Sequence, residues 1–209
     1  MQVPIDQGSH LEGDLEVPQG ASGIVVFAHG SGSSRHSPRN KHVAKILQKG
    51  GLATLLIDLL TMDEEEADMA TAHLSFDIGL LTKRLCAVTD WLIKDDKTKH
   101  LQIGYFGAST GAAAALSAAA EKKGAVKAVV SRGGRPDLAV HLPQVKAPTL
   151  LIVGGYDIPV IGMNEEALAL LQCEKKLVIV PKATHLFEEP GALDQVAQLA
   201  LRWFSQHLK

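Results

Sequence analysis

The chain has 209 residues, a formal net charge of −2 and 46% hydrophobic residues, which is the composition of an ordinary soluble globular protein. A charge so close to zero gives no general attraction to nucleic acid or to an anionic membrane. No apolar run reaches the roughly 18 residues that a membrane-spanning helix needs, and the opening MQVPIDQGSH has neither the basic nor the apolar part of a signal peptide. We therefore expect one cytoplasmic domain over residues 1–209, with no nucleic-acid or membrane partner.

The two cysteines, Cys86 and Cys173, lie in helix-like segments, and we expect both to be free, buried thiols. The sequence contains no C-x-x-C, no H-E-x-x-H and no histidine pair three or four residues apart. These are the spacings typical of metal ligands, so we predict no metal and no other cofactor.

The first part of the chain predicts three strands and two clear helices. An alternating strand at residues 11–17 is expected at a sheet edge, and continuous apolar runs at 23–28 and 52–58 predict strands buried on both faces. Helices are expected at about 40–49 and at 75–94, the second with Ser75 as its N-cap. Between them, residues 61–72 predict a loop or short helix, whose acidic run at 63–66 we interpret as a solvated face.

The second part of the chain continues the alternation. A strand from residue 101 turns sharply into a helix that ends near 121, and further strands are expected at 126–131, 149–153 and 177–180. Helices are predicted at 163–172, capped by Asn164, and at 193–208. This alternation predicts an α/β fold with a mostly parallel sheet and helices on both faces. In such sheets, functional residues gather in the loops after the carboxyl ends of the strands.

One of these turns, Gly-Ala-Ser-Thr-Gly at residues 107–111, fits the nucleophile-elbow pattern G-x-S-x-G. In an elbow the serine, here Ser109, is held in a strained conformation that exposes its hydroxyl, and Gly107 and Gly111 allow a close approach of strand and helix. The pattern alone also fits a turn without chemistry, or a phosphate loop at a helix N-terminus. However, the sequence contains neither G-x-G-x-x-G nor G-x-x-x-x-G-K-[ST].

The loops after two later strands supply the other residues of a catalytic triad. Asp157 and then His185 follow Ser109, each directly after a predicted strand, which is the chain order of α/β-hydrolases. The serine needs a base, which we assign to His185, and the imidazole needs a carboxylate, which we assign to Asp157. Asp137, one strand earlier, is the alternative acid.

On these residues the chain resembles a small serine hydrolase of the α/β-hydrolase superfamily, within the dienelactone-hydrolase-like group. The resemblance covers essentially the whole chain, and its marks are FAHGSG at 27–32, GASTG at 107–111, GYDIPV at 155–160 and ATH at 183–185. Dienelactone hydrolase itself uses a cysteine nucleophile, whereas Ser109 stands here. This difference favours an ordinary serine esterase mechanism.

A tetrahedral intermediate also needs hydrogen-bond donors for its oxyanion. The backbone N–H of Thr110, which follows the nucleophile and opens the helix, is the first candidate. The resemblance implies that the second is the backbone N–H of Ser31, after His29-Gly30. As both are main-chain donors, their side chains need not matter. We expect His29 to brace this loop rather than to transfer protons.

Four arginines, namely Arg35, Arg39, Arg132 and Arg135, lie in loops at the same sheet edge. They either form ion pairs, for example with the acidic run at 63–66, or bind an anionic group of the substrate, for which Arg35 and Arg132 are the candidates.

Only about 17 residues separate the strands at 126–131 and 149–153, which leaves room for one short helix and no large lid. We therefore expect an open site, and a serine hydrolase that cleaves small or soluble carboxylic esters through an acyl-enzyme. Thioesters, lactones or short peptides could be cleaved by the same triad. The remaining alternative is a catalytically weak protein that uses the hydrolase fold to bind a ligand or partner.

Overall fold

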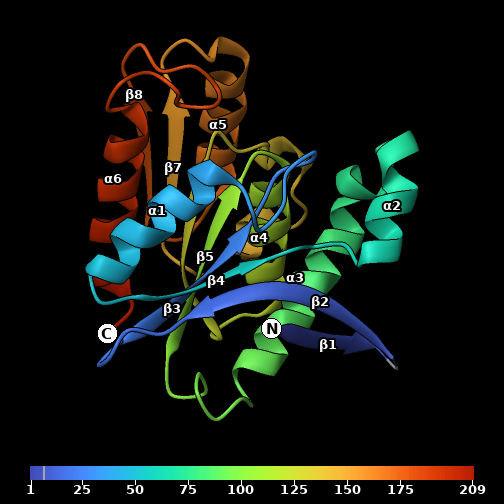
Figure 1. Cartoon of the computed structure of the whole chain (residues 1–209). Coiled ribbons are helices and arrows are strands. Elements are labelled where there is room, and N and C mark those ends of the chain that lie inside the picture. Colours follow the sequence, from blue (N-terminus) through green and yellow to red (C-terminus); the bar gives the residue numbers. More distant parts are fainter. Residues whose placement is uncertain (7) are drawn as a thin grey trace.

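An eight-stranded sheet forms the centre of the computed structural model, which describes residues 1–6 and 8–209 (Figure 1). The strand order is β1-β2-β4-β3-β5-β6-β7-β8, and every pairing from β4 to β8 is parallel. β2 runs antiparallel to both of its neighbours. The prediction of a mostly parallel sheet is therefore confirmed. The strands are β1 (Gln2–Asp6), β2 (Ser9–Glu16), β3 (Gly23–Ala28), β4 (Ala53–Ile57), β5 (Gln102–Ala108), β6 (Val126–Arg132), β7 (Thr149–Gly154) and β8 (Lys175–Val180).

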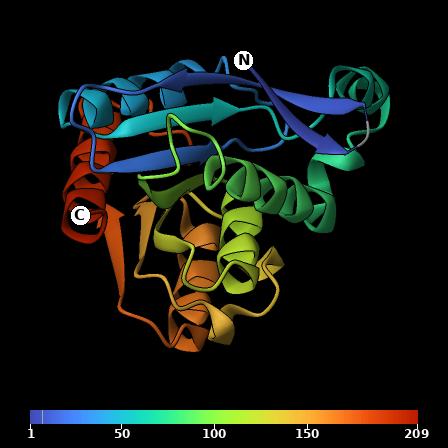
Figure 2. The same ribbon diagram turned by 90° about the horizontal axis from the view of Figure 1, so that it is seen from below.

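Helices cover both faces of the sheet, as predicted (Figures 1 and 2). Apolar residues of α1 and α6 form one buried cluster against the sheet, and those of α3, α4 and α5 form the other. The mostly alanine helix α4 is buried along nearly its whole length, which lets it lie close to the strands. The α-helices are α1 (Pro38–Lys49), α2 (Met62–Thr71), α3 (Ile78–Leu92), α4 (Thr110–Glu121), α5 (Ile158–Leu170) and α6 (Ala192–His207), and the 3₁₀ turns are η1 (Leu74–Phe76), η2 (Pro136–Leu138) and η3 (Leu142–Gln144).

The N-terminal segment corrects one prediction. The strand expected at the sheet edge, residues 11–17, is β2 and lies between β1 and β4. β1 takes the edge, with Val3 fully buried and Pro4 exposed. Proline has no N–H to donate and is therefore tolerated in such an edge strand.

The starts of α3 and α1 differ from the predicted ones, the first because another residue caps the helix and the second because a proline opens it. The carboxylate of Asp77 accepts the N–H of Leu80 at 2.9 Å and caps α3. The predicted cap, Ser75, lies in η1 instead. Likewise, α1 begins at Pro38 rather than near residue 40, because proline with its fixed φ suits the first helical turn.

Helix α5 begins at Ile158, five residues before the predicted start. Its predicted cap, Asn164, is buried inside the helix. The Asn164 side-chain amide donates to the backbone oxygens of Gly134 at 3.0 Å and of Val160 at 2.8 Å. This asparagine therefore ties α5 to the loop after β6 instead of starting the helix.

The acidic run at 63–66 belongs to α2 and is only in part a solvated face. Glu64 forms a capping box with Thr61 at the start of the helix. The same carboxylate pairs with Arg84 of α3 at 2.6 Å, whereas its acidic neighbours are exposed. One member of the run therefore attaches α2 to the body of the domain.

Both cysteines are free, as predicted. Cys86 is buried in α3, but Cys173 is only partly buried and follows the end of α5, which corrects the expectation of two buried helical thiols. Within residues 1–6 and 8–209, no helix is long and apolar enough to cross a membrane.

Candidate active site

Ser109 lies at a strained turn between β5 and α4. Its backbone has φ 51° and ψ −121°, a conformation that residues other than glycine rarely adopt. A Cβ added at Gly107 would lie 2.4 Å from the Cα of Ala112, and one added at Gly111 would lie 2.2 Å from the carbonyl oxygen of Ala28. The turn therefore has the backbone of a nucleophile elbow, and both glycines are sterically required.

Two of the three predicted catalytic side chains are hydrogen bonded to each other. Nδ1 of His185 lies 2.6 Å from Oδ2 of Asp157. A carboxylate can only accept, so Nδ1 carries the proton and Nε2 is left as a base. The loops after β7 and β8, which carry Asp157 and His185, are also joined through their backbones, because the N–H of Tyr156 donates to the carbonyl of Ala183 at 2.9 Å.

The loop after β6 links Ser109 to His185. The N–H of Ser109 donates to the carbonyl of Arg132 at 3.3 Å, and the N–H of Arg135 donates to the carbonyl of Ser109 at 3.1 Å. Gly133 lies between Arg132 and Arg135 in the sequence, and a Cβ added to it would lie 3.5 Å from Nδ1 of His185. The Ser109 hydroxyl itself makes no hydrogen bond to the described residues. In ligand-free enzymes the hydrogen bonds used in catalysis are often long or poorly aligned.

The alternative acid, Asp137, has a different partner. Both of its carboxylate oxygens accept hydrogen bonds from the guanidinium of Arg135, at 2.9 and 2.8 Å. This interaction lowers the pKa of Asp137. The carboxylate that reaches His185 is that of Asp157.

The two predicted oxyanion donors lie next to each other, although they are 79 positions apart in the sequence. The N–H of Thr110 belongs to the first turn of α4, where backbone donors have no acceptor within the helix. The N–H of Ser31, however, donates to Oγ1 of Thr110 at 2.9 Å. Ser31 could serve an oxyanion only by sharing or releasing this bond. A main-chain donor at Thr110 needs no particular side chain, but the structure gives the Thr110 hydroxyl a direct contact with the loop that contains Ser31.

His29 has the geometry of a bracing residue. Its Nε2 accepts the N–H of Leu59 at 3.2 Å, so Nδ1 carries the proton and donates to the carbonyl of Gly30 at 3.0 Å. Burial lowers the pKa of His29, which keeps the ring neutral. Both ring nitrogens are thus occupied in holding the loop that contains Ser31.

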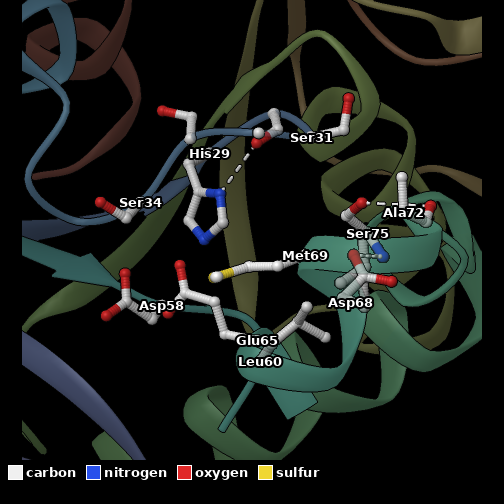
Figure 3. A pocket seen from close by; sticks show the side chains of 14 residues that line it. His29, Ser31, Ser34, Asp58, Leu60, Glu65, Asp68, Met69, Ala72 and Ser75 are labelled. Atoms are coloured by element: carbon white, nitrogen blue, oxygen red, sulfur yellow. Dashed lines mark hydrogen bonds between the residues drawn. The ribbon is translucent and has the colours of Figure 1, made fainter. Parts of the chain in front are cut away.

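A cavity of about 390 Å³ lies beside this loop (Figure 3). Residues 29–34 form one wall and α2 contributes another, with Glu65 and Met69 directed inward. The cavity borders on the elbow through Gly30 and Ser31, although Ser109 and His185 are not among the residues that line it. The sequence did not indicate that α2 would form this wall, since its helical pattern is weak.

The four loop arginines differ in their partners. Arg35 pairs with Asp58 through its guanidinium and also lies 3.8 Å from Asp14. Arg39 pairs with Glu188, and Arg135 with Asp137 as described above. Three of the four arginines are therefore ion paired, as one of the two interpretations expects, but with carboxylates outside the acidic run at 63–66. Arg132 is buried, and it forms no ion pair with a carboxylate among the described residues.

Comparison with known protein families shows that residues 11–208 match the model of the dienelactone hydrolase family. The chain belongs to the dienelactone hydrolase family. It has the α/β-hydrolase fold and is 65% identical to a dienelactone hydrolase of Anabaena variabilis, whose crystal structure superposes with a TM-score of 0.98 over 100% of this chain and 97% of that one. The esterase Est1E of Butyrivibrio proteoclasticus shares the fold at 18% identity, with a TM-score of 0.79 over 98% of each chain.

Two curated relatives from Mycobacterium tuberculosis, provisionally named phosphoribosyl transferases, are 59% identical over 199 residues. The match covers 95% of this chain but 44% of each relative. The chain thus spans less than half the length of these curated relatives.

Proposed function

We propose that this family member is a serine hydrolase that cleaves small or soluble carboxylic esters with Ser109, His185 and Asp157. The observation that carries the proposal is the strained Ser109 elbow beside a His185–Asp157 pair joined at 2.6 Å. A carboxylate on Nδ1 fixes the imidazole tautomer and stabilises the imidazolium that forms during catalysis.

In the proposed reaction, Nε2 of His185 takes the proton of the Ser109 hydroxyl as Oγ attacks the ester carbonyl carbon. The carbonyl oxygen becomes an oxyanion, to which the N–H of Thr110, and of Ser31 once freed from Thr110 Oγ1, would donate. The intermediate collapses, and the imidazolium returns its proton to the leaving alcohol. Water, deprotonated by the same imidazole, then attacks the acyl-enzyme and releases the acid with regeneration of Ser109.

The segment between β6 and β7 supports a preference for small or soluble esters. It contains only the short turns η2 and η3, so it provides no large lid over Ser109. We propose the cavity beside residues 29–34 as the place for one side of the substrate. Thioesters, lactones and short peptides remain alternative acyl donors, because they would use the same steps.

The name of the mycobacterial relatives suggests phosphoribosyl transfer, but we do not propose this activity for the present chain. Its matched region corresponds to the hydrolase family, and it covers 44% of those relatives. We propose that any transferase activity resides in the portion of those proteins that this chain does not match.

The test is hydrolysis of p-nitrophenyl esters from acetate to octanoate by wild type and by Ser109→Ala. We expect the substitution to abolish turnover and wild-type activity to fall with acyl length. Ser205→Ala, an exposed position on α6, is the matched control and should behave as wild type. Activity that survives in Ser109→Ala would contradict the proposed nucleophile.

If no ester is turned over, labelling with a fluorophosphonate probe separates the remaining functions. Labelling at Ser109, mapped by mass spectrometry, would support a competent triad with another acyl donor. No labelling would favour a protein that uses this fold only to bind a ligand or partner.

A further inference from the structure

The cavity of about 390 Å³ and the His185 imidazole belong to opposite halves of the sheet edge. The cavity is built from the loop after β3, which includes Gly30, and from the segment after β4, which includes α2. In the sheet, β3 and β4 lie on one side of β5, which ends at the elbow, whereas β6, β7 and β8 lie on the other. Asp157 follows β7 and His185 follows β8, and neither is among the described residues that line the cavity. The cavity and the imidazole thus flank Ser109 from opposite sides.

The cavity reaches the nucleophile through Gly30. A Cβ added at Gly30 would lie 3.0 Å from the Cβ of Ser109, so the loop after β3 passes directly against the Ser109 side chain. In the tetrahedral intermediate, the carbon bonded to Oγ also carries the oxyanion, the leaving group and the acyl chain. The oxyanion needs the N–H of Thr110, and the leaving oxygen needs the proton that Nε2 of His185 holds. The acyl chain is then the substituent that faces the cavity.

The described lining of the cavity contains carboxylates but no lysine or arginine. Asp58 is already paired with Arg35, and Asp68 already accepts two backbone N–H groups. The Glu65 carboxylate points from α2 into the cavity (Figure 3). The His29 ring adds no charge, because its Nε2 accepts a hydrogen bond and is therefore unprotonated. A group that enters the cavity thus meets a negative charge at Glu65 and no positive side chain of the described lining.

Helix α2 also presents an apolar side chain to the cavity. Met69 is 82% exposed, although its side chain points inward from the same helix as Glu65 (Figure 3). Leu60 and Leu81 add apolar surface to the lining. An acyl chain in the cavity would cover this surface with its methylene groups, and the flexible thioether of Met69 can adjust to the chain.

We propose that this cavity is the acyl subsite, and that Glu65 makes it select acyl chains with a cationic or neutral end over chains with an anionic end. This inference rests on the proposed ester hydrolysis and specifies the class of acyl group. In a partly enclosed cavity the effective dielectric constant is lower than in water, so the carboxylate attracts a cation and repels an anion more strongly. Met69 limits the length of the acyl chain that fits.

The first test compares three p-nitrophenyl esters whose acyl chains differ at the end. The 4-(trimethylammonio)butyrate is cationic, the 5,5-dimethylhexanoate is its neutral isostere, and the 4-sulfobutyrate is anionic. In wild type, kcat/KM should be at least about tenfold higher for the cationic than for the anionic ester, with the neutral ester between them.

Glu65→Gln should lower this cationic-to-anionic ratio at least about threefold, mainly through KM. Glu66→Gln is the matched control and should keep the wild-type ratio, because Glu66 is exposed on the same helix and is not among the described lining residues. A ratio that Glu65→Gln leaves unchanged, or a preference of wild type for the anionic ester, would overturn the proposal.

The second test fills the cavity. Met69→Trp should lower the ratio of kcat/KM for p-nitrophenyl octanoate to that for the acetate at least about threefold, because the longer chain needs the space that the indole takes. Met62→Trp is the matched control, since Met62 is 74% exposed on α2 and is not among the described lining residues. An unchanged ratio in Met69→Trp would place the acyl chain elsewhere.

The acyl subsite and the proposed nucleophile fail in different ways. The p-nitroanilides of the same three acids have a poorer leaving group, and their binding to Ser109→Ala can be measured by calorimetry without turnover. Tighter binding of the cationic than of the anionic anilide, weakened by adding Glu65→Gln, would support the acyl subsite even if Ser109 proved not to be the nucleophile. No binding, or equal affinity for both anilides, would overturn the acyl subsite even if Ser109→Ala abolishes ester hydrolysis.

Discussion

Replacing Gly111 by alanine should destabilise the protein, although glycine-to-alanine changes in helices usually stabilise. The usual gain is at most about 1 kcal/mol. Here the new Cβ would lie 2.2 Å from the carbonyl oxygen of Ala28 and 2.4 Å from that of His29. These are backbone atoms of the neighbouring chain segment, which cannot rotate away. Overpacking typically costs about 1–3 kcal/mol, and we expect the upper end or more, hence a net loss of about 2 kcal/mol.

For a protein of this size, about 2 kcal/mol corresponds to a fall of roughly 4–8 °C in melting temperature. The measurement is thermal unfolding by circular dichroism, with urea unfolding to obtain the free energy. Gly162→Ala in α5 is the matched control, because a Cβ there meets nothing within 4 Å. It should raise the melting temperature by about 2–4 °C. If Gly111→Ala melts at or above wild type, the steric explanation of the elbow glycines is wrong.

Three further predictions follow from single contacts. Asp157→Asn should lower kcat for esters by about 10³–10⁴-fold because the imidazole loses its charged partner. Asp137→Asn should change kcat by less than about threefold, since Asp137 contacts Arg135 instead. Similar losses in both variants would argue against Asp157 as the acid. Burial raises the pKa of Cys86 to about 12, so at pH 8 only about one thiol in ten thousand is ionised. Iodoacetamide should therefore label Cys86 far more slowly in native than in urea-unfolded protein, as measured by peptide mass spectrometry. Equal labelling rates would contradict the burial of Cys86. Thr89→Val removes the hydrogen-bond partner of the buried Tyr105 hydroxyl and should lower the free energy of unfolding in urea by about 1–3 kcal/mol. Tyr105→Phe should lower this free energy less in the Thr89→Val background than in wild type. Strictly additive losses would mean that the two hydroxyls are not coupled.

The sequence alone determined the fold class, most strand positions and the elbow. Apolar runs of strand length and helical periodicity are local properties, so they can be recognised before any tertiary contact is known. The same holds for Gly107-Ala108-Ser109-Thr110-Gly111, where a strained turn needs particular residues at fixed positions. Errors occurred where a distant or weakly patterned segment decided the outcome, as with β1 at the sheet edge and the early start of α5.

Only the tertiary structure decided which of several similar side chains have partners. In the sequence Arg35 and Arg132 are equivalent loop arginines, yet one pairs with Asp58 and the other is buried without a carboxylate. The contact between Ser31 and Thr110 likewise joins two strands' ends that are far apart in the chain. Burial and pairing depend on which elements pack together and in what register, because the dielectric surroundings and available partners of a charge are set by residues remote in sequence.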